Sequence, residues 1–436
     1  MTFPNAEELL RGWRWPRSSL GEDAVVCFAS ALRAVAPGPA VERALAGVGP
    51  ARFTHLLALG KAAIPMAEAA SRWQVARGDA WRASVAVAPE GSTSAGSGLS
   101  IVHGDHPVPG QHSARAAGAI GAFAEGMTAD DHVLVLLSGG TSSLAGAPVA
   151  GVSLESLQAI FRMLLASGLD IHEANTVRKR FLRWGGGRLA AALAPAHIHV
   201  LAISDVPRDE PATIGSGPVS PDDSTPADVT ALLAAHELDL PRDAAAALTA
   251  MSRGDAPGMP GRDAPCFRRV TFQVIASNAT ALEAAAAMAR SLGYSTALEP
   301  DGLHGDAREV GKELAQRLRA QPPGQRCALI MGGETTVTLG RSAGTGGRNQ
   351  ELALAAAKGL DGAAHVALLA AGTDGKDGNS ALAGGLVDGD TWKRIPDGAA
   401  QLRTHESSAA LASAGAALYT GLTGTNVMDV VIGLRA

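Results

Sequence analysis

The sequence has few cysteines and few aromatic residues. It contains 3 cysteines in 436 residues, and Phe, Trp and Tyr together make up 4% of the chain. Cys27, Cys266 and Cys327 are odd in number and widely spaced, so they form neither a framework of paired disulfides nor the close spacing of a zinc finger. Such cysteines are typical of buried thiols in a reducing compartment, and we therefore expect a cytoplasmic protein.

Long runs of one chemical character are also missing. No apolar stretch is long enough to cross a bilayer, because Gly, His, Ser or a charged residue interrupts each one. The first residues lack the charged-then-apolar pattern of a signal peptide. The net charge is −5, and the longest run of consecutive Lys and Arg residues is the three at 178–180. Neither a nucleic-acid partner nor a membrane is therefore expected.

Several common site motifs are absent. The chain has no G-x-x-x-x-G-K-[ST] sequence, which excludes a P-loop nucleotide site, and no H-E-x-x-H zinc motif. It also lacks a G-x-G-x-x-G fingerprint after a strand, so a dinucleotide-binding Rossmann site has no support. Any site in this chain must be built by other loops.

What the chain does contain is glycine and a repeated alternation of segments. It has 52 glycines and 46% hydrophobic residues, and short apolar runs lead through glycine-rich loops into alanine-rich amphipathic stretches. The clearest examples are at 55–76, 132–168 and 327–360. This alternation predicts buried, mainly parallel strands followed by helices, and therefore an α/β fold.

The length predicts two domains rather than one. Pro, Gly and charged residues crowd between Leu240 and Arg262, as in a linker. We therefore predict a Rossmann-like α/β domain at 1–245, a linker at 246–264 and a second α/β domain at 265–436. Each is expected to be an α/β/α sandwich with a mainly parallel or mixed sheet. Because ligands bind beyond the carboxyl ends of such strands, the active-site cleft is expected between the domains.

Two glycine loops in the first half follow apolar runs. Lys61 comes directly after one such run and a glycine, and only six of the 37 basic residues are lysines. A lysine there is either a surface residue that caps a turn or a ligand for phosphate or carboxylate. The second loop presents consecutive N–H groups and hydroxyls, which indicates either a common Gly-Gly turn or an anion-binding nest. Its residues are Ser138, Gly139, Gly140 and Thr141.

Two more segments of the first half carry polar residues. Asn175 and Arg178 lie in a basic stretch that is either a solvated helix face or part of a binding site. Asp205 follows a buried apolar run. A carboxylate there either caps a turn, takes a proton from a hydroxyl or holds Mg²⁺ beside phosphates.

The second half repeats this arrangement. Glu334 and Thr335 follow an apolar run, and a glycine-rich loop then leads to Arg348 and Asn349 at the start of a helical stretch. This loop is either tight turn geometry or a cradle for an anion. An arginine at a helix N-terminus opposes the helix dipole, so a functional reason for Arg348 is expected. Glu334 is expected to support Arg348 rather than to bind Mg²⁺.

Asp374 is the strand-end acid of the last glycine loop. The EF-hand spacing is not met there, which argues against calcium. One lysine, one arginine, strand-end acids and hydroxyl-rich glycine loops are the groups that phosphoryl transfer requires, because that reaction depends on positioning and charge stabilisation. The residues therefore favour a phosphotransferase.

A series of motifs along the chain resembles one family. The chain resembles the glycerate 2-kinases that carry a C-terminal MOFRL domain and are often labelled hydroxypyruvate reductases, through GKAAIPMA, HPVPG, LLSGGTSSL, NTVRK, GGRLA, SDVP, GSGPVSPD, GGETTVT, GTGGRNQELALAAA, GTDGKDG and TGTNVMD. The resemblance covers nearly the whole chain. It implies two α/β domains, a cleft, and ATP- and Mg²⁺-dependent phosphorylation of the 2-hydroxyl of D-glycerate to 2-phosphoglycerate.

The resemblance implies roles for residues in these motifs. Lys61, Asp205 and Arg348 match the family's catalytic lysine, aspartate and arginine. Mg²⁺ would be bound by Asp205 or Asp374, although no metal ligand is assigned. The expected partners are a small hydroxy acid and a nucleotide, and a homodimer is one candidate assembly. The candidate substrate- or ATP-binding residues are Ser138, Gly139, Gly140, Thr141, Asn175, Arg178, Glu334, Thr335, Asn349 and Asp374.

Four positions depart from the family's pattern. Thr141 replaces a glycine, Leu182 a serine, Gly185 a lysine and Ala381 an acid. These changes leave the exact hydroxy acid open. Two alternatives therefore remain: an NAD(P)H-dependent hydroxypyruvate reductase, and a non-catalytic sensor that binds a small acid or nucleotide.

Overall fold

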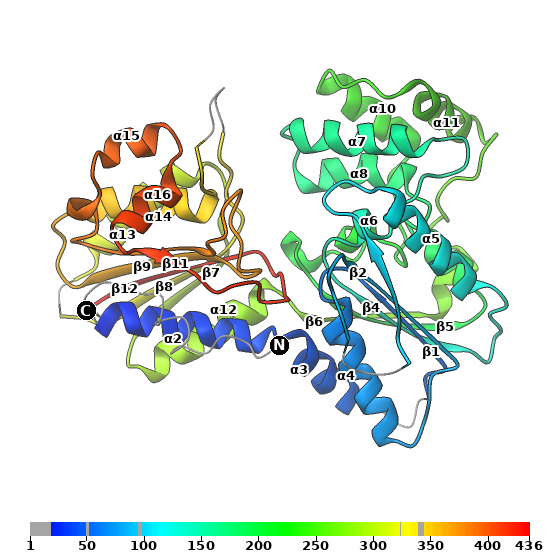
Figure 1. Ribbon diagram of the computed structural model, residues 1–436, viewed down its shortest axis with the longest axis horizontal. Helices are drawn as coiled ribbons and strands as arrows, with labels where there is room; N and C mark the ends of the chain where they lie inside the picture. Colours follow the sequence, from blue (N-terminus) through cyan, green and yellow to red (C-terminus); the bar gives the residue numbers. More distant parts are fainter. Residues whose placement is uncertain (1–18, 49–51, 95–97, 323, 339–343) are drawn as a thin grey trace. The chain divides into compact units, whose positions relative to one another are not determined.

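The structure is a computed structural model that describes residues 19–48, 52–94, 98–322, 324–338 and 344–436 (Figure 1). The chain divides into two compact units. The first unit comprises residues 37–275, and the second comprises residues 276–436 together with the described residues up to Ala36. Each unit is built on a six-stranded sheet with helices on both faces, which confirms the predicted α/β class.

The sheet of the first unit has the order β3-β2-β1-β4-β5-β6. The strands β1 to β5 pair in parallel. The central strands β1 and β4 are almost entirely buried, which explains why their sequences are unbroken apolar runs. The strand bounds are β1 His55–Leu59, β2 Ala83–Pro89, β3 Ser100–Gly104, β4 His132–Leu137, β5 His197–Ile203 and β6 Val270–Ala276.

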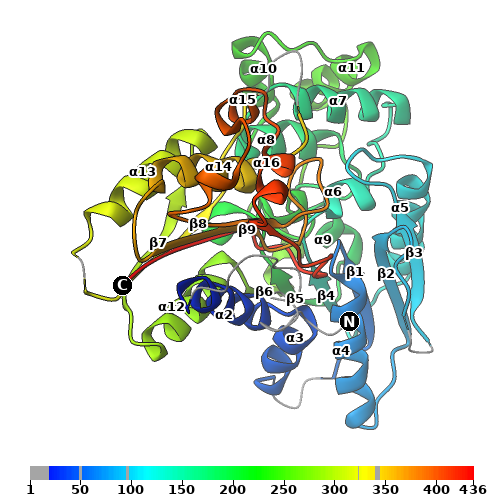
Figure 2. The same ribbon diagram turned by 60° about the vertical axis from the view of Figure 1, so that its left-hand side comes forward.

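Helices cover both faces of this sheet (Figure 2). The helices α5 (Gln111–Ala124) and α9 (Arg188–Leu193) bury Ile120 and Leu193 against alternate residues of β1, β4 and β5. The helices α3 (Pro37–Ala46) and α4 (Ala63–Ala76) pack on the other face. Four further helices form a separate small core around Phe161 and Phe181. They are α7 Leu154–Ala166, α8 Ile171–Phe181, α10 Pro226–Ala235 and α11 Arg242–Arg253.

The sheet of the second unit is mixed, with the order β11-β10-β9-β12-β8-β7. Only β7 and β8 pair in parallel among the described strands of this sheet, and β12 runs antiparallel between β8 and β9. The start of β12 therefore lies beside the ends of β8 and β9. The strand bounds are β7 Ser295–Leu303, β8 Cys327–Gly333, β9 Val366–Gly372, β10 Gly384–Asp388, β11 Ala417–Leu418 and β12 Asp429–Arg435.

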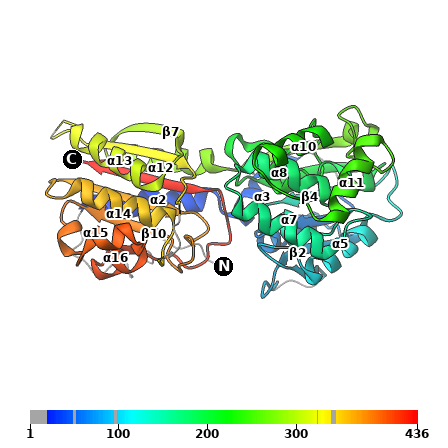
Figure 3. The ribbon, with the colours of Figure 1, turned by 90° about the horizontal axis from the view of Figure 1, so that it is seen from above.

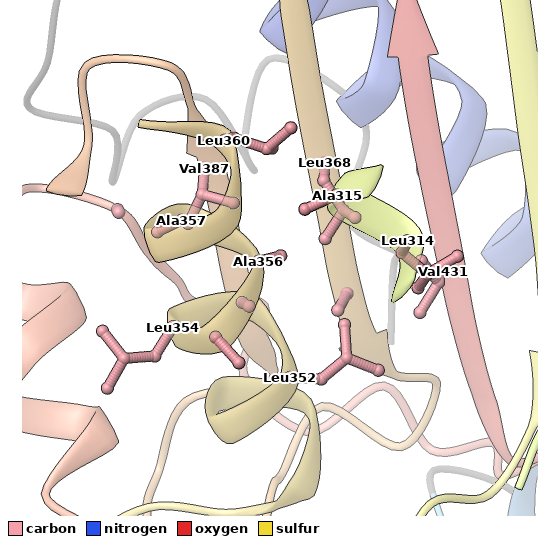
Figure 4. Packing of buried hydrophobic residues seen from close by; sticks show 14 of the residues in the cluster. Leu314, Ala315, Leu352, Leu354, Ala356, Ala357, Leu360, Leu368, Val387 and Val431 are labelled. Atoms are coloured by element: carbon pink, nitrogen blue, oxygen red, sulfur yellow. The ribbon is translucent and has the colours of Figure 1, made fainter. Parts of the chain in front are cut away.

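Helices also cover both faces of the second sheet. The helices α2 (Ser19–Ala34) and α12 (Asn278–Ser291) pack on one face, and α13 (Ala307–Ala320), α14 (Arg348–Leu360) and α16 (Ser407–Ser413) lie over the other (Figures 1 and 3). Nearly every residue of α14 is buried, because it packs against α13, α16 and the sheet. Figure 4 shows this core, in which apolar side chains of α14 pack near Leu314, Leu368 and Val431.

The observed division differs from the predicted domains in two places. The predicted linker, 246–264, lies inside the first unit, and β6 beyond it pairs with β5. The described residues 19–36, predicted to belong to the first domain, pack in the second unit. Tyr294 donates a hydrogen bond of 2.6 Å to Asp23 there. In both cases tertiary burial decides where a segment belongs, and local composition does not reveal it.

No single helix in the described residues is long and apolar enough to cross a membrane. The helices α2 and α3 meet the length and composition criterion only as a pair, which is bent by 52°. The helix α2 is also buried along much of its length, with Val25, Phe28 and Leu32 fully covered.

Candidate functional site

Three loops meet at the carboxyl ends of β1, β4 and β5 in the first unit. Because these strands are parallel neighbours, the residues that follow them lie side by side. The backbone N–H of Lys61 donates to the carbonyl of Gly139 at 2.9 Å, and the N–H of Ala62 donates to the hydroxyl of Ser138 at 3.1 Å. We call Lys61, Ser138 to Thr141 and Asp205 the first-unit cluster.

Glycine allows these loops to approach one another. Gly60 has a φ of +113°, and a Cβ on it would overlap the carbonyl and hydroxyl oxygens of Ser138. A Cβ on Gly139 would overlap the carboxylate of Asp205. The carboxylate therefore rests directly against the glycine backbone, which no other residue at position 139 would permit. The structure thus brings together three of the segments that the sequence predicts.

Lys61 supplies a cation to this cluster. Its side chain runs along Gly140, because a Cβ at that glycine would lie 3.1 Å from Lys61 Cγ. Within the part of the chain that the structure describes, the ammonium makes no hydrogen bond and no ion pair. It is therefore not a turn cap held by a carbonyl, and its charge is available to an anionic ligand.

Asn175 and Arg178 are tied to this region by a chain of hydrogen bonds. Asn175 Oδ1 accepts from the Ser216 hydroxyl at 3.0 Å and from Arg178 Nη1 at 3.3 Å, and Ser216 bonds Ser142 at 2.6 Å. Burial lowers the pKa of Arg178 to about 10, and the charge of Asp205 opposes that decrease. Arg178 therefore lies within electrostatic reach of Asp205.

The alternative of a solvated helix face is wrong for this basic stretch. Asn175, Lys179 and Arg180 are only 2%, 4% and 3% exposed. Lys179 forms an ion pair with Asp222 and also donates to the carbonyl of Ala212 at 3.1 Å. Tertiary partners from the segment after β5 cover this side of α8, and the sequence around α8 gives no sign of them.

A second group of charges lies at the strand ends of the second unit. Arg348, the first residue of α14, donates from Nε and Nη2 to the two carboxylate oxygens of Asp429, at 2.5 and 3.0 Å. Its Nη1 lies 2.6 Å from Oε1 of Glu334. Asp429 begins β12, where it pairs with Gly333 and Gly372 at the ends of β8 and β9. We call Arg348, Asp429 and Glu334 the second-unit cluster.

The two carboxylates stabilise the protonated, positively charged form of Arg348. Burial by itself would lower the pKa of Arg348, but Asp429 and Glu334 outweigh this effect and raise it above its ordinary value. The predicted ion pair of Glu334 with Arg348 is confirmed. Asp429 had no predicted role, although a carboxylate directly before the apolar run of β12 is a signal for one.

A protein carboxylate occupies the N-terminus of α14. Asp377 accepts from the backbone N–H groups of Asn349 and Gln350, at 3.2 and 2.8 Å, and from the side chains of both residues. Burial raises the pKa of Asp377, and the hydrogen bonds from Gln350 oppose that increase. Asn349 is 1% exposed and its side chain is committed to Asp377. Of the two alternatives for this loop, tight turn geometry or a cradle for an anion, the structure shows N–H groups that bind a carboxylate of the protein itself.

Thr335 and Asp374 also lie at strand ends of the second unit. Thr335 follows β8 and is 3% exposed. Asp374 follows β9 and accepts from the N–H of Lys376 at 3.1 Å. The structure therefore places both residues close to the ends of β8 and β9, the two strands between which β12 lies. The predicted roles of Thr335 and Asp374 in binding stay predictions.

Three of the four departures from the family pattern share one location. Thr141, Leu182 and Gly185 line a cavity of about 10 Å³ in the first unit, beside Leu59 and Gly215. A space of this size holds at most one water molecule. The fourth, Ala381, lies in the second unit.

A divalent metal such as Mg²⁺ requires oxygen ligands, which carboxylates supply. Among the described residues, no group of three or more His, Cys, Asp or Glu side chains could hold a metal ion. Mg²⁺ commonly uses only one or two protein carboxylates and takes its other ligands from substrate phosphates and water. Asp205 and Asp374, single carboxylates at strand ends, fit this pattern. The predicted cleft between the domains stays a prediction, since the two clusters belong to different units.

Comparisons with known proteins identify the family. The model of a domain of unknown function (DUF4147) matches residues 23–249, and that of the MOFRL family matches residues 327–429. The D-glycerate 2-kinase of Thermotoga maritima is 36% identical over 427 residues, which span 95% of this chain and 98% of the relative. An Agrobacterium vitis relative, named only provisionally as a hydroxypyruvate reductase, is 39% identical over 76% of each chain.

A solved structure agrees with these matches. The crystal structure of glycerate kinase from Thermotoga maritima superposes with a TM-score of 0.84 at 35% identity, and the match covers 96% of this chain and 100% of that one. The similarity therefore extends through both units. The chain belongs to the glycerate 2-kinase family with a C-terminal MOFRL domain.

Proposed function

We propose that this chain is a kinase that transfers the γ-phosphoryl group of ATP to the 2-hydroxyl of D-glycerate, giving 2-phosphoglycerate and ADP. Membership of the glycerate 2-kinase family supports this function. The observation that carries it is the first-unit cluster, in which the Asp205 carboxylate rests on Gly139 near the unpaired ammonium of Lys61. A base and a cation so placed are what phosphoryl transfer to an alcohol requires.

Asp205 orients the attacking hydroxyl and accepts its proton. The 2-oxygen of glycerate forms a bond to the γ-phosphorus as the bond to the β–γ bridging oxygen breaks, and the electron pair leaves with ADP. Lys61 neutralises charge on the transferring group, and its compact ammonium suits a phosphate oxygen. The N–H groups of the loop at 138–141 are candidate donors to the same anion.

Arg348 provides the second fixed cation. Asp429 is 2% exposed on its side chain and holds the guanidinium by two bonds, whereas Glu334 is 48% exposed. A substrate carboxylate or phosphoryl oxygen can therefore take the place of Glu334 without breaking the buried pair. Such an exchange keeps the arginine oriented while it binds an anion.

Mg²⁺ would be bound at Asp205 or Asp374 together with phosphate oxygens of ATP. When bound, it supplies positive charge that neutralises the phosphates. At either position the protein contributes one carboxylate that contacts neighbouring backbone. Asp205 rests on Gly139, and Asp374 accepts a hydrogen bond from the N–H of Lys376.

An assay of ADP release with D-glycerate tests this function. Lys61→Met and Asp205→Asn are each expected to lower kcat/KM by about 10²- to 10³-fold, the usual effect of losing a preorganised electrostatic group. Lys312→Met is the matched control, because Lys312 is an exposed lysine paired with Glu309 on α13. Unchanged kcat/KM in both site variants would refute the assignment.

The product and a redox assay separate the alternatives. Phosphorus NMR of 2-phosphoglycerate shows coupling to one adjacent proton, whereas a 3-phosphate couples to two. Oxidation of NADH with hydroxypyruvate would instead support the reductase, and nucleotide binding without turnover of any hydroxy acid would support the sensor.

A further inference from the structure

A cavity of about 340 Å³ lies in the second unit between two loops, 375–381 and 419–422. Its volume is in the range of about 300–1,000 Å³ that is typical of small-molecule sites. Its lining combines Tyr419 and Leu422 with the polar residues Lys376, Asn379 and Ser380. None of these side chains has a role in the clusters described above.

The two loops are held together by close contacts. A Cβ on Gly375 would overlap the carbonyl of Gly421, so the backbones touch at that point. The N–H of Thr423 donates to the carbonyl of Asp374 at 3.2 Å, and its hydroxyl donates to the carbonyl of Thr373 at 2.6 Å. The cavity is therefore preformed by the fold.

An aromatic and an aliphatic side chain of this cavity are unusually exposed. Tyr419 is 57% exposed and Leu422 is 74% exposed, and they are two of only five exposed large hydrophobic residues in the described part of the chain. An exposed ring and an exposed aliphatic group beside a preformed cavity offer apolar surface to a flat heterocycle. Such surface favours the base of a nucleotide over a small hydroxy acid.

One polar residue of the cavity, Asn379, contacts the loop that precedes Arg348. Asn379 accepts from the N–H of Gly346 at 2.8 Å and donates to the carbonyl of Gly344 at 3.2 Å. These glycines belong to the loop that ends at Arg348. Lys376 makes no side-chain hydrogen bond or ion pair within the described residues, so its ammonium is available to an anion.

We propose that this cavity binds the adenosine part of ATP. Tyr419 and Leu422 contact the base, and Lys376 lies on the side from which the phosphates extend along the loop towards Arg348. This inference rests on the proposed kinase function, because it assigns the nucleotide subsite of that activity. It adds a function to Tyr419, Leu422 and Lys376.

Titration with a fluorescent ADP analogue labelled on the ribose tests the assignment directly. Tyr419→Ala is expected to weaken binding about 5- to 100-fold, as for the loss of one stacked base, whereas Tyr419→Phe keeps the ring and the affinity. Leu165→Ala is the matched control, because Leu165 is also 57% exposed and lies on α7 of the first unit. In kinetic assays Tyr419→Ala should raise KM for ATP and leave KM for glycerate unchanged.

Competition separates recognition of the base from recognition of the phosphates. Adenosine should displace the analogue from the unaltered protein, and this competition should be lost in Tyr419→Ala while inorganic triphosphate still competes. An unaltered affinity of Tyr419→Ala for the analogue, in protein that phosphorylates glycerate, overturns the subsite and leaves the kinase function standing. Tyr419-dependent binding of the analogue in protein that phosphorylates no hydroxy acid supports the subsite and refutes the kinase function.

Discussion

Arg348 and Asp429 form the most constrained charge pair among the candidate site residues. The guanidinium donates two bonds to a carboxylate that is 2% exposed, and the partners are 81 residues apart in the sequence. Removing one member of such a buried pair leaves an uncompensated charge, which costs about 3–5 kcal/mol. The structural and catalytic effects of a change at Arg348 are therefore combined, and one substitution does not separate them.

A double variant separates these effects. Arg348→Ala is expected to lower the free energy of unfolding by about 3–5 kcal/mol and to reduce kcat. Adding Asp429→Asn removes the orphaned charge and should restore much of the stability, whereas kcat stays low because the cation is still missing. Urea unfolding and steady-state kinetics measure the two quantities. Recovery of kcat in the double variant would show that Arg348 acts only through stability.

At the scale of elements, strand ends position both clusters. In the first unit, the three loops follow the neighbouring parallel strands β1, β4 and β5, so the polar residues after these apolar runs reach the same edge of the sheet. In the second unit, β12 runs antiparallel and brings Asp429, at its first residue, to the ends of β8 and β9. The residue patterns predicted the first arrangement directly. They did not predict the second, because no local pattern reveals which strand will pair beside β8.

Histidines lie on β1 and β5 of the first sheet, towards the strand ends that are opposite to the first-unit cluster. Their titration affects stability. Burial lowers the pKa of His55, on β1, and of His199, on β5, and local desolvation lowers the pKa of the exposed His197, also on β5. Asp131 opposes the decrease at His55, and Arg269 adds to it at His197. His197 also stacks on His132 with ring centroids 4.7 Å apart, so charging both rings would place like charges together.

These histidines predict a loss of stability in weak acid. The folded protein binds fewer protons at them than the unfolded chain, so stability is present above a pH of about 6.5 and falls as the pH drops below it. Calorimetry should show a lower Tm at about pH 5 than at about pH 8. The double variant His197→Gln and His199→Gln should show a smaller decrease, and an identical decrease would contradict this explanation.

At the scale of the whole molecule, the chain passes between the two units twice. The helix α2 packs with α12 in the second unit, and the chain then forms the whole first unit before it returns near Ala276. Fully burying a large apolar side chain contributes about 1.5–3 kcal/mol, and α2 buries Val25, Phe28 and Leu32 completely. The second unit therefore depends on a segment that is remote from it in sequence.

Fragments test this dependence. Residues 276–436 alone are expected to lack a cooperative unfolding transition, because the face that α2 covers is left exposed. Joining residues 19–36 to this fragment through a flexible linker should restore the transition, as followed by circular dichroism. Equal stability of the two fragments would show that α2 is dispensable. Residues 37–275, which form the first unit, serve as the control. This fragment should unfold cooperatively without α2.

The sequence by itself determined the α/β class and the main strands and helices, and it predicted Lys61, Asp205 and Arg348 as candidate site residues. These features are local, since each depends on an apolar run and the polar residues that directly follow it. Tertiary structure alone decided to which unit α2 and β6 belong. It determined that Arg348 pairs with Asp429 and that Asp377 caps α14. It also decided that Lys179 pairs with Asp222 inside the protein. Each of these depends on contacts between distant segments, where burial and charge pairing act only after the chain has folded.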